Sequence, residues 1–191
     1  MLLEEIELVR LLQNGDRAAF KTLVTRWQDM VYNTALGLMQ NESDAEDVAQ
    51  EVFVKVFEAV NSFKGESKLS TWLYQITIRK SLDALRKKKR KKRFSFIYSL
   101  YNENDELIHD PPDFVHPGVM AENKEDAEWL FKAVKRLPEN QKTAFILNKM
   151  ETLSYNEVGE IMNLSTNAVD ALLQRAKKNL KKYLSDLLKE Q

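Results

Sequence analysis

The chain has 191 residues and equal numbers of basic and acidic residues, 29 of each, so its formal net charge is zero. It contains no cysteine, which excludes disulfides, thiolate metal ligands and a cysteine nucleophile. Glycine and proline are scarce, at 5 and 4 residues, so few turns are available and we expect an all-α protein. No apolar stretch approaches the roughly 18 residues of a membrane span, and no signal-peptide pattern opens the chain. We therefore expect a cytoplasmic protein without membrane insertion.

Two helices joined by a short turn are predicted at the start of the chain. Apolar residues recur at helical spacing over Leu2–Asn14 and again over Arg17–Met39. Between them, Gly15 is suited to the C-terminal cap of the first helix and Asp16 to the N-cap of the second. The pattern therefore predicts a short helix followed by a long amphipathic one.

A third and a fourth helix follow, separated by a polar loop. Ser43 and Glu46 have the spacing of a capping box and predict where the third helix begins. Its apolar residues, including Phe57, lie on one stripe that we expect to face the core. Residues 61–70 include a glycine and many polar residues, which indicates a loop, and the helical period resumes over Thr71–Lys88.

The last third of the chain predicts a separate helical domain. Residues 94–123 contain three of the four prolines and no sustained period, so we expect a flexible linker there. Within Ser154–Lys177, two helical segments are separated by about three residues, the spacing of a helix-turn-helix. We therefore divide the chain into an N-terminal domain (1–93), an acidic linker (94–123) and a C-terminal helix-turn-helix domain (124–191).

Positive charge is concentrated at the end of the N-terminal domain. Residues 79–93 hold ten Lys or Arg against one Asp, while residues 94–128 hold nine acids against one Lys. The uninterrupted run Arg86–Arg93 (RKKKRKKR) has the charge needed to contact several phosphates, which would make binding strongly salt-dependent. The alternative is a solvated start of the linker, and charge alone leaves both interpretations open.

The outer face of the third predicted helix begins with acidic and polar residues, among them Asp47, Gln50 and Glu51. Clustered carboxylates can bind Mg²⁺, dock a basic partner, or complement the positive end of the helix dipole. Metal catalysis needs carboxylates that converge from several elements, and none is evident, so we favour partner docking. The two histidines, His109 and His116, lie in the linker without metal-ligand spacing. We expect no metal site, no catalytic residue and no cofactor.

Two further segments carry side chains suited to nucleic acid. Residues 63–72 (FKGESKLSTW) combine aromatic, basic and hydroxyl side chains that can stack unpaired bases. A buried Phe63 and Trp72 under an ordinary loop is the alternative. On the second helix of the helix-turn-helix, Asn167, Gln174 and Arg175 can read base edges in the major groove. A helical hairpin used only for packing remains the alternative there.

In order and spacing, these segments resemble bacterial RNA polymerase sigma factors of the extracytoplasmic-function type. The N-terminal domain carries GDRAAFKTLV, DAEDVAQEVFVKVF, FKGESKLSTWLYQI and SLDALRKKKR, and the C-terminal domain carries RLPENQKTAFILNKMETLSYNEVGEIMNLSTNAVDALLQRAKKNL. The resemblance covers nearly the whole chain and implies a promoter-specificity subunit rather than an enzyme. It implies one domain for the clamp helices of the largest polymerase subunit and the −10 promoter element. The other domain would bind the polymerase flap and the −35 element.

Matched position by position, the resemblance assigns residues to three functions. Binding of core polymerase falls to Asp47, Gln50 and Glu51. Binding and melting of −10 DNA, with capture of a flipped base, falls to Phe63, Lys64, Ser67, Lys68, Thr71, Trp72, Gln75, Arg79, Lys80 and Arg86. Binding of −35 DNA falls to Ser165, Thr166, Asn167, Asp170, Ala171, Gln174, Arg175 and Lys178. The implied partners are core RNA polymerase, duplex and melted promoter DNA, and an anti-sigma factor.

Two positions depart from the family pattern. Arg79 stands where the −10 helix usually has Asn, and Asp170-Ala171-Leu172 stands where the −35 helix often has Lys/Arg-Ser-Arg. The promoter sequence therefore cannot be transferred from the family.

Two other functions are weighed against a sigma factor. A free-standing helix-turn-helix regulator would bind a palindromic duplex as a dimer, but the sequence shows no obvious dimerisation stripe. A metal-dependent enzyme acting on nucleic acid through the acidic helix is the weakest hypothesis, and cleavage abolished by Asp47→Ala would be its signature.

Overall fold

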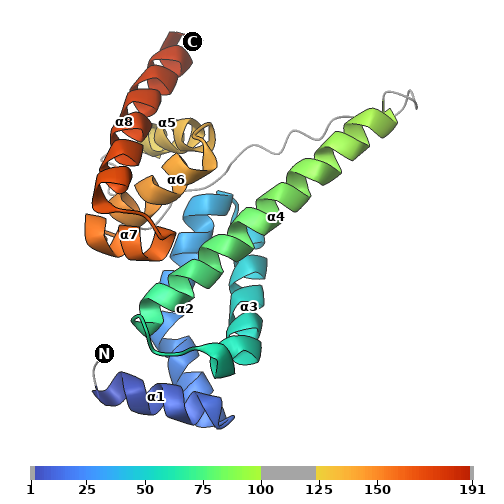
Figure 1. The fold of residues 1–191 in the computed structure, drawn as a ribbon. Helices are drawn as coiled ribbons and strands as arrows, with labels where there is room; N and C mark the ends of the chain where they lie inside the picture. Colours follow the sequence, from blue (N-terminus) through green and yellow to red (C-terminus); the bar gives the residue numbers. More distant parts are fainter. Residues whose placement is uncertain (1–2, 100–123, 190–191) are drawn as a thin grey trace.

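The computed structural model describes residues 3–99 and 124–189, and every regular element in these two ranges is helical. The N-terminal part holds α1 (Leu3–Gln13), α2 (Arg17–Met39), α3 (Glu42–Ala59), the 3₁₀ turn η1 (Val60–Ser62) and α4 (Leu69–Ser99). The C-terminal part holds α5 (Lys124–Lys135), α6 (Glu139–Phe145), the π-helical segment η2 (Ile146–Met150), α7 (Tyr155–Met162) and α8 (Thr166–Lys189) (Figure 1). The predicted all-α fold is confirmed. None of the described helices is long and apolar enough to cross a membrane.

Side-chain caps set where α2 and α3 begin. Asp16 accepts a hydrogen bond at 2.8 Å from the backbone N–H three residues on and caps α2, as predicted. The prediction for α3 is wrong, because Asn41 rather than Ser43 is its N-cap, accepting a backbone hydrogen bond at 2.9 Å. Gln40 ends α2 in the left-handed region, with φ of 53°. Asn41, which follows it, is extended and is therefore the first residue that can serve as the N-cap of a new helix.

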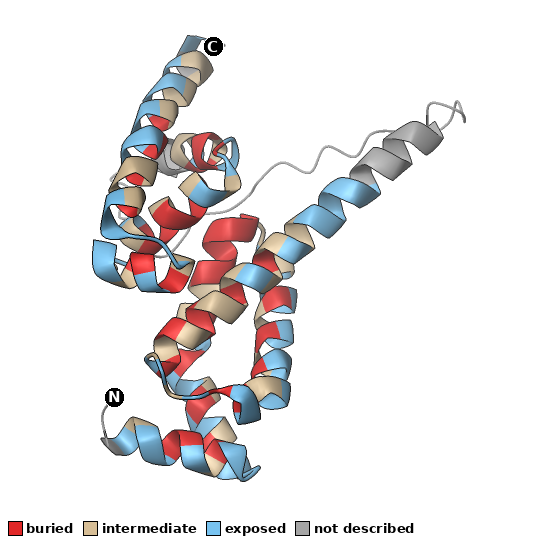
Figure 2. Cartoon of the chain, in the orientation of Figure 1, coloured by how far each residue is buried: buried red, intermediate tan, exposed pale blue. Residues whose placement is uncertain are grey.

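The core of the N-terminal domain lies between α2, α3 and α4. Leu23 and Val52 are among its fully buried side chains, and Figure 2 shows buried residues on the facing sides of these helices. Phe57 departs from the predicted inward stripe, because its side chain is 60% exposed and meets Phe20 edge-on with ring centroids 5.4 Å apart. Val56 takes the inward position, so Phe57, about 100° further round the helix, faces outward.

α1 holds the loop that joins η1 to α4. The side-chain amide of Gln13 donates to the backbone carbonyls of Val60 and Phe63, at 3.3 and 3.1 Å. Glu5 accepts a hydrogen bond from the Leu69 N–H at 2.7 Å and so satisfies one of the free donors in the first turn of α4. The first helix of the chain therefore holds both ends of a loop that is distant in the sequence.

α4 continues into the segment predicted as a linker. The expected domain boundary is residue 93, whereas the helix ends at Ser99. The chain has neither glycine nor proline between Gly65 and Pro111, and Lys and Arg favour helices, so nothing in the sequence stops the helix after its last core contact. The rest of the predicted linker, residues 100–123, lies outside the described residues.

α7 and α8 form the predicted helix-turn-helix. Ser154 caps α7 in a capping box with Glu157. In the turn that follows, Asn163 is left-handed and the Leu164 N–H donates to the Gly159 carbonyl at 2.8 Å. A Cβ on Gly159 would lie 2.7 Å from the Leu164 carbonyl oxygen, so the close approach of the two helices requires glycine there.

The two domains pack against each other, with α7 against α4 and η2 against α2. Ile146 and Met150 of η2 belong to the same buried cluster as the core of α1–α4. Tyr74 of α4 belongs to a second buried cluster with Leu147 and Ile161 from the C-terminal domain. The centre of the interface is therefore apolar and continuous with the cores of both domains.

Candidate nucleic-acid and protein-binding surfaces

The three predicted docking residues form one exposed row on α3. Asp47, Gln50 and Glu51 are all exposed, and their spacing places them on neighbouring turns of the same face. Lys80 reaches across from α4 and pairs with Glu51 at 3.2 Å. Exposed ion pairs of this kind contribute little to stability, so a binding partner can replace Lys80 at small cost.

Two apolar side chains that the sequence pattern did not assign to a binding surface extend this row. Val54 and Phe57 are each 60% exposed. Val54 follows Glu51 by three residues and Asp47 by seven, so helical spacing was the signal that could have found it. We call Asp47, Gln50, Glu51, Val54 and Phe57 the α3 row. Its mixture of carboxylates and exposed apolar groups suits a protein partner better than a phosphate backbone.

The predicted −10 residues lie at different depths along the loop and α4. Those exposed are Lys64, Lys68, Arg79 and Arg86, and those half-buried are Ser67, Trp72, Gln75 and Lys80. Phe63 and Thr71 are buried, and the Phe63 ring packs against Trp72 with centroids 5.1 Å apart. In this structure, neither Phe63 nor Thr71 exposes a surface that could contact a base directly. Phe63 instead forms part of the core under the loop, which is the alternative its spacing allowed.

The basic run lies on the half of α4 that extends beyond the body of the protein (Figure 1). Residues 86–91 are all exposed. Lys88 pairs with Asp44 of α3 at 2.6 Å, and Arg86 pairs with Glu139 of the C-terminal domain at 3.0 Å. A helix that presents a series of exposed cations past its last core contact is suited to binding phosphates.

The predicted −35 residues occupy the start and the outer side of α8. Those exposed are Ser165, Thr166, Asn167, Gln174, Arg175 and Lys178, while Asp170 and Ala171 are half-buried. Ser165 is occupied as the helix cap, since its hydroxyl accepts from the Ala168 N–H at 3.3 Å. Asp170 accepts a hydrogen bond from the Gln174 amide at 3.4 Å. The outer side of α8 is therefore polar and open, as a helix in the major groove requires.

Three ionisable groups near the domain interface are shielded from solvent, with Tyr74 and Lys142 buried and Glu151 half-buried. The Tyr74 hydroxyl donates to the Glu151 carboxylate at 3.1 Å. Burial raises the pKa of Glu151 to about 7, and it raises the pKa of Tyr74 together with the neighbouring Glu151 charge. Burial, with Lys89 and Lys135 nearby, lowers the pKa of Lys142 to about 8. Among the described residues, no three His, Cys, Asp or Glu side chains are grouped to hold a metal ion.

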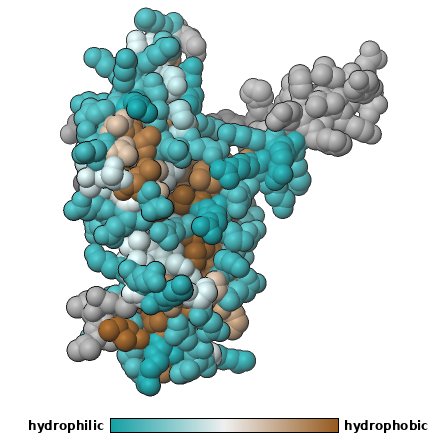
Figure 3. Space-filling view, viewed as in Figure 1, coloured by the Kyte–Doolittle hydropathy of each residue, from teal (hydrophilic) through white to brown (hydrophobic). Residues whose placement is uncertain are grey.

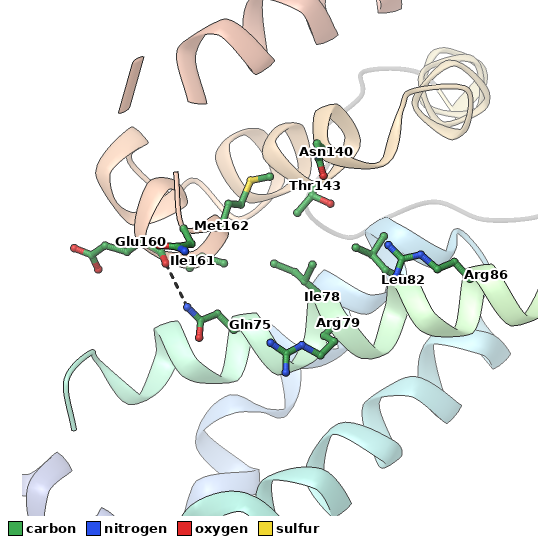
Figure 4. A pocket seen from close by; sticks show the side chains of 11 residues that line it. Gln75, Ile78, Arg79, Leu82, Arg86, Asn140, Thr143, Glu160, Ile161 and Met162 are labelled. Atoms are coloured by element: carbon green, nitrogen blue, oxygen red, sulfur yellow. Dashed lines mark hydrogen bonds between the residues drawn. The ribbon is translucent and has the colours of Figure 1, made fainter. Parts of the chain in front are cut away.

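Most of the described surface seen in Figure 3 is hydrophilic, and its apolar side chains form small separate patches. A cleft of about 490 Å³ lies between the domains, lined by Gln75, Ile78 and Arg79 of α4 and by Glu160 and Met162 of α7 (Figure 4). Three residues that line the cleft, Gln75, Arg79 and Arg86, belong to the predicted −10 set. The C-terminal domain thus lies directly beside residues assigned to promoter DNA.

Segments in both domains match known protein families. Residues 23–91 match the family Sigma-70 region 2, and residues 127–180 match the family Sigma-70, region 4. The RNA polymerase sigma-H factor of Pseudomonas aeruginosa is 30% identical over 187 residues, which cover 98% of this chain and 97% of that protein. The ECF RNA polymerase sigma-E factor of Haemophilus influenzae is 32% identical over 184 residues, covering 95% of each chain. The ECF RNA polymerase sigma factor SigW of Bacillus subtilis is 29% identical over 183 residues, covering 94% of this chain and 96% of that protein.

Two solved structures share the fold. CnrH, in complex with the cytosolic domain of CnrY, gives a TM-score of 0.68 at 19% identity, covering 95% of this chain and 97% of that chain. The sigma factor RpoE from Bartonella quintana, in complex with the anti-sigma factor NepR, gives a TM-score of 0.66 at 23% identity, covering 87% of this chain and 96% of that chain. At these identities the likeness establishes the fold alone.

Proposed function

Because the chain belongs to the RNA polymerase sigma factors of the extracytoplasmic-function group, we propose which of its surfaces bind core polymerase and which bind promoter DNA during initiation. It directs core RNA polymerase to specific promoters and assists DNA opening. The N-terminal domain binds the clamp helices of the largest polymerase subunit and the −10 element, and the C-terminal domain binds the flap and the −35 element. The protein acts in the cytoplasm with the polymerase and performs no catalysis of its own.

The α3 row is the observation that supports polymerase docking. Negative charge for a basic partner comes from Asp47 and Glu51. Apolar area that is exposed to solvent in the free chain comes from Val54 and Phe57. Protein interfaces combine apolar and polar contacts in this way. The capped start of α3 holds the row on a rigid element, so the partner meets a surface that is already formed.

Promoter contact is divided between α4 and α8. The exposed cations at 86–91 contact phosphates, which makes binding depend steeply on salt. Lys64, Lys68 and Trp72 lie along the loop and the start of α4, where an unpaired base would stack, and buried Phe63 supports Trp72 from below. On α8, the polar outer side reads base edges of the duplex.

An anti-sigma factor is the proposed regulator. RpoE from Bartonella quintana was solved with such an inhibitor bound. For this chain, we propose an inhibitor that covers the polymerase-binding surface, because the α3 row carries the exposed apolar groups that an inhibitor can bury. Affinity purification from the native cell in the absence of the inducing stress should recover it, and recovery of polymerase subunits alone would count against it.

Run-off transcription tests the proposal. Core polymerase from the same organism is combined with the protein on DNA fragments from upstream of its own gene. We expect specific initiation with the wild-type chain and loss of both core binding and initiation with Asp47→Ala/Glu51→Ala. The matched control, Glu4→Ala/Glu128→Ala, removes the same charge at exposed positions outside the α3 row and should initiate normally.

The opposite result would favour a free-standing regulator. That result is an absence of core binding and of initiation, together with specific binding of a palindromic duplex by the protein alone.

A further inference from the structure

The turn between α5 and α6 is surrounded by positive charge. Lys135 is the last residue of α5, and Lys142 lies one turn into α6. Lys89, on the exposed half of α4, lies near enough to Lys142 to repel its charge, and so does Lys135. Arg86, one turn before Lys89, reaches the start of α6 and pairs with Glu139 at 3.0 Å. Three helices thus place four cations around one turn, and we call Lys89, Lys135 and Lys142 the lysine cluster.

The carboxylates at this turn do not neutralise the lysine cluster. Glu139 is paired with Arg86, and Asp83 also pairs with Arg86, at 3.4 Å. The attraction of Glu139 for Lys142 is weaker than the repulsion from either of the other two lysines. None of the three lysines forms an ion pair with another described residue. Two acids therefore serve four cations, and both of them are engaged by the arginine.

Burial makes this arrangement costly for Lys142. The residue is only 8% exposed, and lysine is rarely buried without a partner of opposite charge. Its pKa is lowered to about 8 by burial and by the two neighbouring lysines, so most of the side chain is still charged at neutral pH. A buried ammonium group that lies near two others is stabilised when an anion is placed among them.

The geometry restricts the chemistry of that anion. Lys142 is buried, whereas Lys89 and Lys135 are exposed, so the anion must reach inward from the surface. A single carboxylate or chloride ion would offset one charge and leave the others to repel each other. Linked phosphate groups carry several negative charges and many acceptor oxygens on one compact molecule, and lysine binds phosphate well. The backbone of a DNA duplex lies on a wide rod and cannot reach a buried side chain.

We propose that the lysine cluster binds a small polyphosphate anion, whose linked phosphate groups contact all three lysines together. Free inorganic polyphosphate and the phosphate chain of a nucleotide present the same chemistry to this site. The site goes beyond the proposed function, since Lys135 and Lys142 belong to no surface assigned to core polymerase or to promoter DNA. Its test therefore needs neither polymerase nor transcription.

Isothermal titration calorimetry of the full-length chain tests the proposal, with tripolyphosphate and ATP as probes in phosphate-free buffer without divalent cations. We expect one saturable site for tripolyphosphate and no comparable binding of sulfate at the same ionic strength. The melting temperature of the chain should rise with tripolyphosphate concentration. Equal affinities for ATP and tripolyphosphate would support a site for the phosphate chain alone, and tighter binding of ATP would support a nucleotide site.

Two double variants locate the binding. Lys135→Ala/Lys142→Met removes two members of the lysine cluster and should weaken tripolyphosphate binding by at least about tenfold. Lys87→Ala/Lys91→Ala removes the same charge from exposed positions of the basic run that do not act on Lys142. This matched control should bind tripolyphosphate as the wild type does. If it loses as much affinity as the first variant, the anion binds the basic run without a built site, and the proposal is overturned.

The thermal stability of Lys142→Met separates loss of the site from loss of the fold. Methionine keeps an unbranched apolar side chain in the buried position but removes the charge. Without phosphate, the variant should melt at or above the wild-type temperature, because a buried charge without an ion-pair partner is removed. With tripolyphosphate, it should lose most of the stabilisation that the wild type gains.

Lys89→Ala, at an exposed position where folding is not at risk, should weaken binding as well. The proposal is overturned if the wild type shows no saturable binding of tripolyphosphate, or if Lys89→Ala and Lys142→Met both bind it as the wild type does. Binding of a random-sequence duplex without binding of tripolyphosphate would also overturn it, because the phosphate partner would then be nucleic acid.

Discussion

Glu151 should make the stability of the folded chain depend on pH near neutrality. Its side chain is half-buried, and its carboxylate accepts a hydrogen bond from the Tyr74 hydroxyl of the other domain. Burial raises its pKa from 4.5 to about 7, and the hydrogen bond from Tyr74 lowers it by less than burial raises it. Glu157 is the other charged group near this contact, where it acts on the pKa of Tyr74. The perturbation that isolates the effect is Glu151→Gln, which keeps an acceptor for Tyr74 but cannot ionise.

The magnitude follows from the two pKa values. The unfolded chain releases the proton near pH 4.5, whereas the folded chain keeps it until about pH 7, so the folded state binds more protons in that interval. The contribution of Glu151 is therefore fully present below pH 4.5 and is lost as pH rises through about 7. The difference between the pKa values corresponds to roughly 3 kcal/mol. Tyr74→Phe removes the hydrogen bond that lowers the Glu151 pKa, so the loss should extend to higher pH.

Urea unfolding of the full-length chain, followed at a series of pH values, measures this effect. The free energy of unfolding of Glu151→Gln minus that of the wild type should grow by roughly 3 kcal/mol between about pH 5 and pH 8. Glu160→Gln, an exposed acid in the same domain, is the matched control and should run parallel to the wild type. A constant difference between Glu151→Gln and the wild type over this range would refute the reasoning, because it would mean that the carboxyl ionises alike in both states.

Three further predictions concern local structure. Asp16→Ala removes the cap of α2 and should lower the free energy of unfolding by about 1 kcal/mol, as measured in urea, while Asp16→Asn should retain most of it. Gly159→Ala sets a Cβ 2.7 Å from the Leu164 carbonyl oxygen. It should lower the free energy of unfolding by roughly 1–3 kcal/mol, as measured by thermal unfolding, and should weaken binding of −35 duplex. A melting temperature equal to that of the wild type would contradict this prediction. Gln13→Ala removes two hydrogen bonds to the loop before α4; it should cost about 1–2 kcal/mol and speed hydrogen exchange in that loop but not in α8.

Local patterns in the sequence determined most of the helices. Asp16 is the cap of α2, and α7 and α8 form a helix-turn-helix that begins where predicted, at Ser154, although α8 continues beyond Lys177 to Lys189. These features depend on residues within one or two turns of each other, which is the range over which caps and helical periodicity act. The same reasoning failed where two local signals compete. Asn41 and Ser43 are both good caps, and Val56 and Phe57 are adjacent apolar residues of which the helix can turn only one inward.

Only the polar residues of the α3 row could be predicted from the sequence. Its carboxylates stood out by type, and all three predicted docking residues are exposed. Val54 and Phe57 did not stand out, because an apolar residue in an amphipathic helix is expected to face inward unless the neighbouring helices are known. The basic run at 86–93 stood out by charge. That it continues the helix follows from the lack of a glycine or proline that would end α4 there.

Only the tertiary structure decided which surfaces face each other. Nothing local distinguishes Tyr74 or Ile146 from residues that pack inside their own domain, yet both bury their side chains in the contact between domains. Gln13 and Glu5 likewise hold a loop that follows them at a distance in the chain. Packing between distant segments depends on the shape and charge of two surfaces that form only when each domain folds. A sequence pattern does not describe either property. For this sigma factor, the sequence therefore determined the helices and the family, and the tertiary structure determined which faces of those helices meet between the two domains.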